Sequence, residues 1–394
     1  MKILFVHEVS WFNKVVYEIH DFPELLSLRQ HEVHFLDFDE GKPRTRWKTL
    51  TTTETRAHPG SRVFVTTPPR FLGGILGRLL AVIIQPFAFL TLSRRVRPDV
   101  VVVYSVPTSG WQITAICRLM GTPVIARVID VPHVLRTTRF KRAVRMAERF
   151  VFGRASFVST HNEALRSYCI EHGASRFKSA VTLPGCDTQR FSPAPSNAQL
   201  QQQLKILPTH KVIVFMGTLF RFSGVFELIS ELATPLREDP MLRFLILGDG
   251  EDSTRLQALV RNLELTNQVL LSGRIEYDTL ADHLRLGHVA VLPFKPELVT
   301  HCALPGKVLQ YLACGLPTVA TPLHGLQSIV RDGDGVVYAS SPLDMARIAV
   351  HLANEPSERM ELAKRGVDLL NRECNWETQI EKFEQLLVNV IHGQ

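Results

Sequence analysis

One glycine-bounded loop in the second half of the chain combines a cation with a predicted helix start. Residues 215–224 read FMGTLFRFSG, with Gly217 and Gly224 on either side of Arg221, and a helix is predicted from about Val225. Free amides at a helix N-terminus attract anions, and a guanidinium adds a positive charge to such a site. The loop is therefore a candidate phosphate site, although two glycines also fit an ordinary strand-to-helix turn.

Two further loops of the same half show related chemistry. The sequence GDG after a predicted strand holds Gly248 and Gly250, which would let a ligand approach the backbone closely. The turn of Pro305 and Gly306 opens the predicted helix Lys307–Cys314, whose first side chain and free amides suit a phosphate or a ribose diphosphate. An ordinary βα turn explains the GDG sequence equally well.

In the first half, polar side chains directly follow predicted strands. His7 ends the first strand, Ser105 and Asp130 follow two later ones, and His133 lies three residues after Asp130. A carboxylate in such a place could orient a hydroxyl, and a histidine could relay a proton. Asp130 could equally serve as a turn or helix cap.

The elements that must position these residues follow a βαβ pattern along nearly the whole chain. Near-continuous apolar strands separated by longer helical patterns predict parallel sheets covered on both faces. Two such series predict an α/β protein with two doubly wound, Rossmann-like domains facing a central cleft. Ligands of open parallel sheets bind at the carboxyl ends of the strands, where the loops above fall. The predicted strands are 3–7, 33–38, 100–104, 124–128 and 157–160, then 212–216, 243–247, 269–271, 289–293 and 318–321.

Composition and charge divide the chain in the same way. Prolines and polar residues predict a linker at 191–210, between an N-terminal domain at 1–190 and a C-terminal domain at 211–374. A final helix at 375–394 is expected to pack back on the first domain. Residues 1–190 hold 27 Lys and Arg against 15 Asp and Glu, a net of +12, and the remainder holds 18 against 23, a net of −5. The basic half indicates an anionic partner such as a phospholipid surface, a phosphorylated lipid or a nucleic acid, unless it is simply a solvated surface.

The composition also limits the class of protein. With 45% apolar and 21% charged residues in 394, the chain is expected to be globular rather than disordered or fibrous. Six cysteines without CxxC spacing argue against a structural zinc or a redox pair and suit a reducing cytosol. The apolar stretch 79–92 is shorter than the roughly 20 residues that span a bilayer. Two interpretations of this stretch and of the seven arginines and lysines of 136–154 stay open. The two segments could contact an anionic membrane peripherally, or they could be a buried helix and a solvated basic face.

Several segments between about residues 155 and 394 match a set of family motifs in order. Residues 183–193 are similar to the sequence IPNGVDxxRF, and 243–251 to lxilGdGe. LSGR at 271–274 with VLP at 291–293 resembles the pair fxG…vlP, and Asn375-Trp376 resembles a C-terminal tryptophan helix. These motifs resemble those of glycosyltransferase family 4, the retaining enzymes of the GT-B fold, and the first half matches more loosely.

The resemblance implies a nucleotide-sugar site in the second half, with substituted residues. In that family a basic pair in a GRxxxxKG loop neutralises the diphosphate, and two carboxylates seven residues apart bind the sugar and the ribose. Here Thr218 and Ser223 stand at the two cation positions, and Ala303 and Gln310 stand at the two carboxylate positions. Lys307 matches the PxK form of some members.

The resemblance also implies roles for individual residues. Arg221 and Lys307 are the expected replacement cations for a leaving group whose negative charge grows in the transition state. Asp130 stands where the family often has an aspartate or histidine facing the reacting centre, so Asp130, Lys307 and Arg221 are expected to be catalytic. Gln310 is expected to hydrogen-bond the ribose, and Gly273 to Ile275 the base. The expected donor-binding residues are Gly217, Thr218, Ser223, Gly248, Gly250, Gly273, Ile275, Pro305, Gly306 and Gln310, and the acceptor-side candidates are His7, Ser105 and His133.

The resemblance implies a hexosyltransferase that takes a sugar from a UDP- or GDP-linked donor, with retention of configuration and with neither a metal ion nor another cofactor. The expected partners are the nucleotide sugar and a lipid-linked or cell-surface glycan precursor, and no nucleic acid. The expected location is the cytoplasm, at the inner face of the membrane if peripheral contact is made. Two alternatives stay open: a catalytically degenerate protein that only binds a sugar nucleotide or a partner, and a sugar-nucleotide epimerase.

Overall fold

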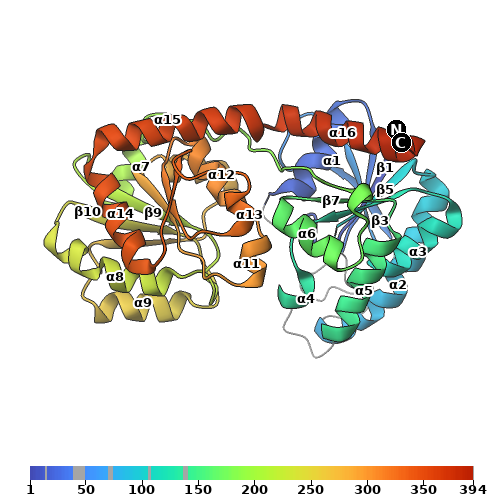
Figure 1. The fold of residues 1–394 in the computed structure, drawn as a ribbon, viewed down its shortest axis with the longest axis horizontal. Helices are drawn as coiled ribbons and strands as arrows, with labels where there is room; N and C mark the ends of the chain where they lie inside the picture. Colours follow the sequence, from blue (N-terminus) through green and yellow to red (C-terminus); the bar gives the residue numbers. More distant parts are fainter. Residues whose placement is uncertain (14–15, 39–48, 70–73, 105–107, 136–140, 394) are drawn as a thin grey trace. The chain divides into compact units, whose positions relative to one another are not determined.

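The computed structural model describes residues 1–13, 16–38, 49–69, 74–104, 108–135 and 141–393, and it divides into two compact units (Figure 1). The first unit comprises Met1–Leu183 with Glu377–Gln394, and the second comprises Pro184–Trp376. Each unit has its own sheet, largely or wholly parallel, with helices packed against it. The predicted α/β architecture of two doubly wound domains is confirmed.

The sheet of the first unit has the strand order β3-β4-β2-β1-β5-β6-β7-β8 over the described residues. Neighbouring strands are parallel except β3 and β4, which form an antiparallel edge. The sequence does not predict β3, because its residues LTTTE are mostly polar and exposed. The strand order reverses direction between β1 and β5, so the loops after these two strands lie at a switch point. The strands are β1 (Lys2–Val6), β2 (Glu32–Leu36), β3 (Leu50–Glu54), β4 (Val63–Thr67), β5 (Val100–Tyr104), β6 (Val124–Val128), β7 (Phe157–Thr160) and β8 (Ser179–Val181).

The C-terminal helix α16 (Trp376–His392) packs on α1 (Glu18–Leu28) of the first unit (Figure 1). The rings of Phe22 and Phe383 lie 4.4 Å apart, and Glu384 accepts hydrogen bonds from Arg29 at 2.7 Å and from the ring of His31 at 2.6 Å. The other helices of this unit are α2 (Gly74–Val96), α3 (Gly110–Met120), α4 (Pro132–Leu135), α5 (Lys141–Arg154) and α6 (Glu163–Glu171), with a short 3-10 turn at Arg176–Lys178.

The sheet of the second unit is parallel throughout, with the order β11-β10-β9-β12-β13-β14. This is the order 3-2-1-4-5-6 of a dinucleotide-binding sheet, and its switch point lies between β9 and β12. All strands predicted in this half are present. They are β9 (Lys211–Met216), β10 (Leu242–Leu247), β11 (Val269–Gly273), β12 (Val289–Leu292) and β13 (Thr318–Ala320), followed by β14 (Val336–Tyr338), which was not predicted.

An apolar core fills the space between this sheet and the helices α8 and α14. The buried side chains include Phe215 and Phe244 from the strands, Leu232 from α8 and Leu352 from α14. The central strands β9, β10 and β12 are buried over most of their length, so burial on both faces fixes them. The helices are α7 (Ala198–Gln203), α8 (Val225–Glu238), α9 (Ser253–Asn262), α10 (Leu280–Leu284), α11 (Leu298–Cys302), α12 (Gly306–Ala313), α13 (His324–Gln327), α14 (Pro342–Asn354) and α15 (Pro356–Glu373), with a 3-10 turn at Tyr277–Thr279.

The second unit begins at Pro184, ahead of the linker expected at 191–210. The amide of Cys186 donates to the carbonyl of Cys374 at 2.7 Å, and the guanidinium of Arg285 binds the carbonyls of Arg190 and Ser192 at 2.9 and 3.0 Å. These backbone contacts fasten the segment before residue 191 to the second unit. None of the helices in the described part of the chain is long and apolar enough to cross a membrane.

Candidate functional site

The loops after β9 and β10 pack against each other through their backbones. The amide of Gly217 donates to the carbonyl of Leu247 at 2.8 Å. A Cβ added at Gly248 or Gly250 would overlap the backbone of residues 217–219. The packing of one loop on the other therefore explains why residues 248 and 250 are glycines, and no bound ligand is needed for that explanation. The contact joins the two predicted loops into one backbone frame at the switch point.

Lys307, on the first turn of α12, places its amine beside this frame. The amine lies 5.1 Å from the centre of the Phe215 ring and 4.7 Å from that of Phe294, and a Cβ on Gly217 would overlap it. Two aromatic faces attract a cation, although more weakly than a carboxylate does. No carboxylate pairs with Lys307 among the described residues, and burial lowers the pKa of its amine to about 7. An incoming anion would thus meet a cation that has no competing partner.

Tyr311 fixes the helix that carries Lys307. Its hydroxyl accepts a hydrogen bond from the amide of Met216 at 2.6 Å and donates one to the carbonyl of the same residue at 3.3 Å. Met216 is the last residue of β9, so this buried side chain ties α12 to the strand that leads into Gly217. Tyr311 could not be singled out from the sequence, because an apolar helix face predicts only that its ring is buried.

The start of α12 is open on one side. Pro305 precedes the first residue of the helix, Gly306, which is exposed, and a Cβ built on Gly306 would meet no atom within 4 Å. The first amides of a helix have no partner within it. The amide of Val308 donates to the carbonyl of Pro305 at 2.9 Å, whereas no hydrogen bond from the amides of Gly306 and Lys307 is found within the described residues, so these two are available to a ligand. Gln310 lies one turn further along, half-buried, and no hydrogen bond to its side-chain amide is found within the described residues.

The other polar residues of the 217–224 loop have different surroundings. Thr218 is exposed, whereas Ser223 is 1% exposed and its hydroxyl has no hydrogen-bond partner in the described structure. The Arg221 side chain is 81% exposed, with its guanidinium 3.9 Å from the carboxylate of Glu297. The two predicted replacement cations therefore differ: Lys307 is enclosed and lacks an ion pair, while Arg221 is solvated and faces an acid.

At the edge of the sheet, β11 ends at Gly273, with a positive φ of 67° that favours glycine. A Cβ there would meet no atom within 4 Å, and Ile275, two residues on, is half-buried. Gly273 also pairs with Gly248 across an isolated bridge, so this turn joins the same frame.

Two histidines that the sequence analysis did not single out stack at the ends of neighbouring helices. The rings of His301 in α11 and His324 in α13 lie 4.2 Å apart at 27°. Burial, together with the neighbouring His324, lowers the pKa of His301. The two residues come after the neighbouring strands β12 and β13, but they are 23 positions apart in the chain, so spacing gives no signal of their contact.

Among the described residues of the first unit, His7 and Asp130 follow different strands, β1 and β6. His7 follows β1, and its ring lies 5.2 Å from that of Tyr104. Asp130 is half-buried in the bend after β6. Ser105 lies outside the described residues. Next to His7, Glu8 accepts hydrogen bonds from the hydroxyl of Thr108 at 2.7 Å and the amide of Ser109 at 3.1 Å, so its carboxylate holds the start of α3.

His133 belongs to a small hydrogen-bonded cluster. Its Nδ1 lies 2.9 Å from Oε2 of Glu148 and 3.0 Å from the hydroxyl of Tyr168, and its backbone amide donates to Oε1 of Glu148 at 3.0 Å. Glu148 is buried, whereas 16% of the His133 side-chain surface is exposed to solvent. A carboxylate on Nδ1 fixes the ring and its tautomer, as second partners of functional histidines do.

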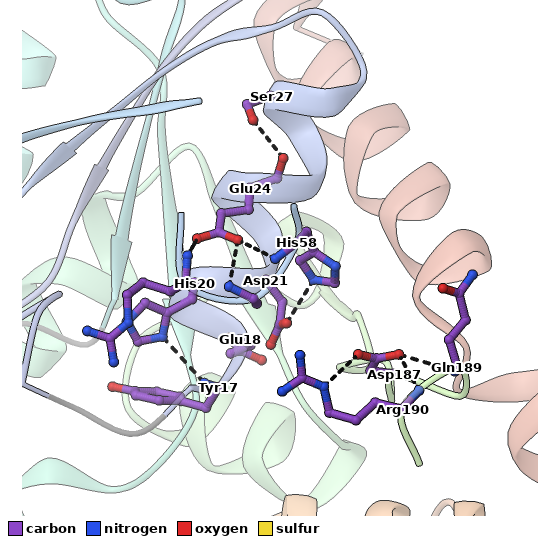
Figure 2. A network of polar contacts seen from close by, with 12 residues as sticks. Tyr17, Glu18, His20, Asp21, Glu24, Ser27, His58, Asp187, Gln189 and Arg190 are labelled. Atoms are coloured by element: carbon purple, nitrogen blue, oxygen red, sulfur yellow. Dashed lines mark hydrogen bonds and ion pairs between the residues drawn. The ribbon is translucent and has the colours of Figure 1, made fainter. Parts of the chain in front are cut away.

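A network of polar contacts in the first unit involves Glu18, Asp21 and Glu24 of α1 (Figure 2). Glu18 binds Arg127 of β6 through two hydrogen bonds of 3.0 and 2.8 Å and the ring of His161 at 2.5 Å. Burial would raise the pKa of Glu18, but the charges of Arg127 and His161 and their hydrogen bonds hold it well below its usual value. One and two turns on, Asp21 binds the ring of His58 at 3.0 Å, and Glu24 accepts the His58 amide at 2.7 Å. These carboxylates anchor neighbouring segments of the unit.

Two sequence families match the chain, one in each half. The description "Glycosyl transferase 4-like domain" matches residues 20–185, and "Glycosyl transferases group 1" matches residues 210–355, which together cover more than half of the chain. The chain belongs to glycosyltransferase family 4. The family resemblance drawn from the sequence is thus confirmed, and each of the two matched domains falls largely within one of the two units.

Curated relatives of the chain include enzymes named for inositol phosphate or phosphatidylinositol compounds. The D-inositol 3-phosphate glycosyltransferase of Kineococcus radiotolerans is 28% identical over 241 residues, which are 56% of this chain and 54% of the relative. A GDP-mannose-dependent monoacylated alpha-(1-6)-phosphatidylinositol monomannoside mannosyltransferase of Corynebacterium glutamicum is 25% identical over 235 residues, 56% of this chain and 61% of the relative. The chain spans about half the length of the curated relatives it matches.

Solved structures of similar fold cover all or nearly all of the chain. Sucrose-phosphate synthase of Thermosynechococcus elongatus superposes with a TM-score of 0.80 at 16% identity, over 100% of both chains. HepE of Anabaena, in complex with UDP, gives 0.76 at 17% identity, over 99% of this chain and 100% of HepE. At such identities the comparison establishes the GT-B fold of the chain.

Proposed function

We propose that this glycosyltransferase moves a sugar from a UDP- or GDP-linked donor to a lipid-linked or cell-surface glycan precursor, with retention of configuration and without a metal ion or other cofactor. One observation carries the proposal: an enclosed lysine amine, Lys307, has no ion-pair partner among the described residues and lies where the two central strands end. A site of this kind attracts a diphosphate. The curated relatives named above act on nucleotide sugars or phosphorylated inositols by their printed names, which supports the substrate class.

In the proposed reaction the second unit stabilises the leaving nucleoside diphosphate. Charge grows on the diphosphate as the bond to the sugar breaks, so the Lys307 ammonium and the free amides at Gly306 lower the barrier. Arg221, on its exposed loop, supplies a second charge when it turns from Glu297 to the ligand. Gln310 hydrogen-bonds a ribose hydroxyl, and the turn from Gly273 to Ile275 contacts the base.

We assign the acceptor to the first unit. Asp130 orients the acceptor hydroxyl, while His7, Ser105 and His133 are further polar contacts for the acceptor. The carboxylate of Glu148 on Nδ1 of His133 leaves the Nε2 atom of that ring as the one for such a contact. The exposed cations of α5, among them Arg142, Arg145 and Arg149, would hold a peripheral protein on an anionic membrane that contains the acceptor.

A second function is favoured by the substituted positions. Thr218, Ser223 and Gln310 replace charged residues of the family, and the Ser223 hydroxyl is buried without a partner in the described structure. A protein that binds a sugar nucleotide without transferring it would show the same substitutions. Fold alone does not decide between the two functions.

Nucleotide release separates the two functions. UDP- and GDP-sugars are incubated with lipid extracts as acceptor source, and nucleoside diphosphate is measured with and without acceptor, in EDTA. Transfer predicts release that depends on acceptor and survives EDTA, and the anomeric coupling of the product by NMR reports retention. A binder releases nothing, yet the preferred nucleotide at about 100 times its dissociation constant still stabilises the fold by about 2.7 kcal/mol in a thermal shift.

A further inference from the structure

A pocket of about 360 Å³ lies between α2 and the edge strands of the first unit, outside the residues assigned to donor and acceptor. Its volume falls within the range of roughly 300–1,000 Å³ that is typical of ligand pockets. The α2 side of the lining is apolar except for Thr91 and Arg95, and the opposite wall comes from Thr49, Thr66 and Pro69. The lining includes Ile84, Phe87, Ala88 and Leu92 from α2, and Thr66 and Pro69 across from them.

Beside this pocket, α2 exposes apolar side chains on its solvent side as well as burying them on its core side. Phe89 is fully buried, whereas Ile83 and Phe87 line the pocket and keep 59% and 67% of their surface exposed. A helix on the surface of a globular protein normally turns polar residues outward. Apolar side chains that are both exposed and part of a pocket wall form a mouth through which an apolar ligand can enter.

One end of the pocket is positively charged. Arg95 lines it, and Arg94 and Arg97 lie beside Arg95 in the chain, all three exposed. No ion pair to any of these arginines is found within the described residues, and the whole domain carries an excess of cations. An apolar cavity with a cation at its end complements a molecule with one alkyl chain and one negative group.

We propose that this pocket binds the alkyl chain of an anionic membrane phospholipid, whose phosphate pairs with Arg95. The chain replaces water along Ile84, Ala88 and Leu92, and the head group stays in solvent at the arginines. This lipid site goes beyond the proposed sugar transfer, since it needs neither the nucleotide sugar nor the residues assigned to it.

Lysophosphatidylglycerols of increasing chain length, each below its critical micelle concentration, test the site by calorimetric titration of the full chain. Each added methylene should tighten binding about fourfold, the ratio that corresponds to about 0.8 kcal/mol per buried CH₂, until the chain outgrows the pocket and the affinity levels off. Lysophosphatidylcholine of equal chain length should bind about two- to fivefold more weakly, because an exposed ion pair contributes little.

Variants locate the bound chain. Ala88→Trp fills the pocket, and Thr91→Trp narrows it from the exposed side of α2 in case the first variant does not fold. Either should weaken binding at least tenfold, and Arg95→Gln should remove the preference for the anionic head group while keeping the chain-length slope. Leu119→Ser, at a residue of α3 that is 89% exposed and outside the pocket, is the matched control and should bind as the wild type does.

Three results would overturn the proposal. The first is an affinity that rises with chain length without levelling off and ignores both tryptophan variants, which indicates adsorption to the surface. The second is no binding of any lysophospholipid. The third is a dimer in solution that Phe87→Ser converts to a monomer in the absence of lipid binding, which would make this face a contact between two copies of the chain. Titration of the same variants with a nucleotide sugar keeps the outcome separate from that of the proposed transfer.

Discussion

Donor affinity should depend on the protonation of Lys307. Burial lowers the pKa of this amine to about 7, and the aromatic rings of Phe215 and Phe294 provide no full negative charge to raise it again. In the free protein the protonated fraction then falls from about 0.9 at pH 6 to about 0.1 at pH 8. A bound diphosphate favours the ammonium form and raises its pKa, so the complex stays protonated at both pH values.

The pH dependence of donor affinity follows from the protonation of Lys307 in the free protein and in the complex. Affinity should be nearly constant below pH 6 and should weaken about tenfold between pH 6 and pH 8, because a neutral amine must first take up a proton. The proton uptake on binding should rise from about 0.1 to about 0.9 over the same interval. A nucleotide sugar is the right ligand, since its diphosphate is a diester and has no proton that titrates in this range.

Calorimetric titration in two buffers of different ionisation enthalpy measures the affinity and the proton uptake together. Lys307→Met should bind weakly at every pH and take up no proton, and Lys307→Arg should show no pH dependence, because a guanidinium stays charged. A pH-independent affinity of the wild type between pH 6 and pH 8, with no proton uptake, would refute the reasoning.

Four further outcomes follow from the same geometry. Lys307→Ala should lower turnover about 100-fold, the usual loss for one transition-state donor, and unchanged turnover in a folded variant would exclude that role. Gln310→Glu should weaken nucleotide binding measured by calorimetry, because a new carboxylate repels the diphosphate, and tighter binding would mean that the site has merely lost its original charge. Tyr311→Phe removes both hydrogen bonds to Met216 and should lower the free energy of unfolding by about 1–3 kcal/mol while also weakening donor binding; a loss of stability with unchanged affinity would contradict the positioning role. Glu18→Gln should destabilise the chain by about 3–5 kcal/mol in urea unfolding, since it leaves the Arg127 charge buried without its acid, and adding Arg127→Met should restore part of the loss.

The fold could be predicted from the sequence because apolar strands and intervening helices are local patterns. The loops of the candidate site could be located from the sequence where a loop directly follows such a strand, as at Gly217 and Gly248, or where a Pro-Gly turn opens a helix, as at Lys307. The edge strand β3 could not be predicted, because its polar residues pair with β4 through the backbone and such pairing does not depend on residue type.

The contacts that position the site could not be predicted from the sequence for a different reason. The hydroxyl of Tyr311 meets Met216 across 95 positions of sequence, and Arg127 meets Glu18 across 109. Nothing in the spacing of these residues signals their contact, because only the folded sheet brings them together. The roles assigned to Arg221, Gln310 and Asp130 therefore stay predictions that rest on the family resemblance.

Because the loops after β9 and β10 contact each other through their backbones, the conformation of the 217–224 loop does not depend on the charges of its side chains. Hydrogen bonds between main-chain atoms hold the frame, and no side chain of Thr218 or Ser223 is part of them. Evolution could therefore exchange the charges on the loop without rebuilding it, and so could an engineer. An arginine at the exposed position 218 would need no rearrangement of the loop, whereas a charged residue at the buried position 223 would require that part of the loop to move outward. Position 218 is therefore the better choice for redesign of the donor site.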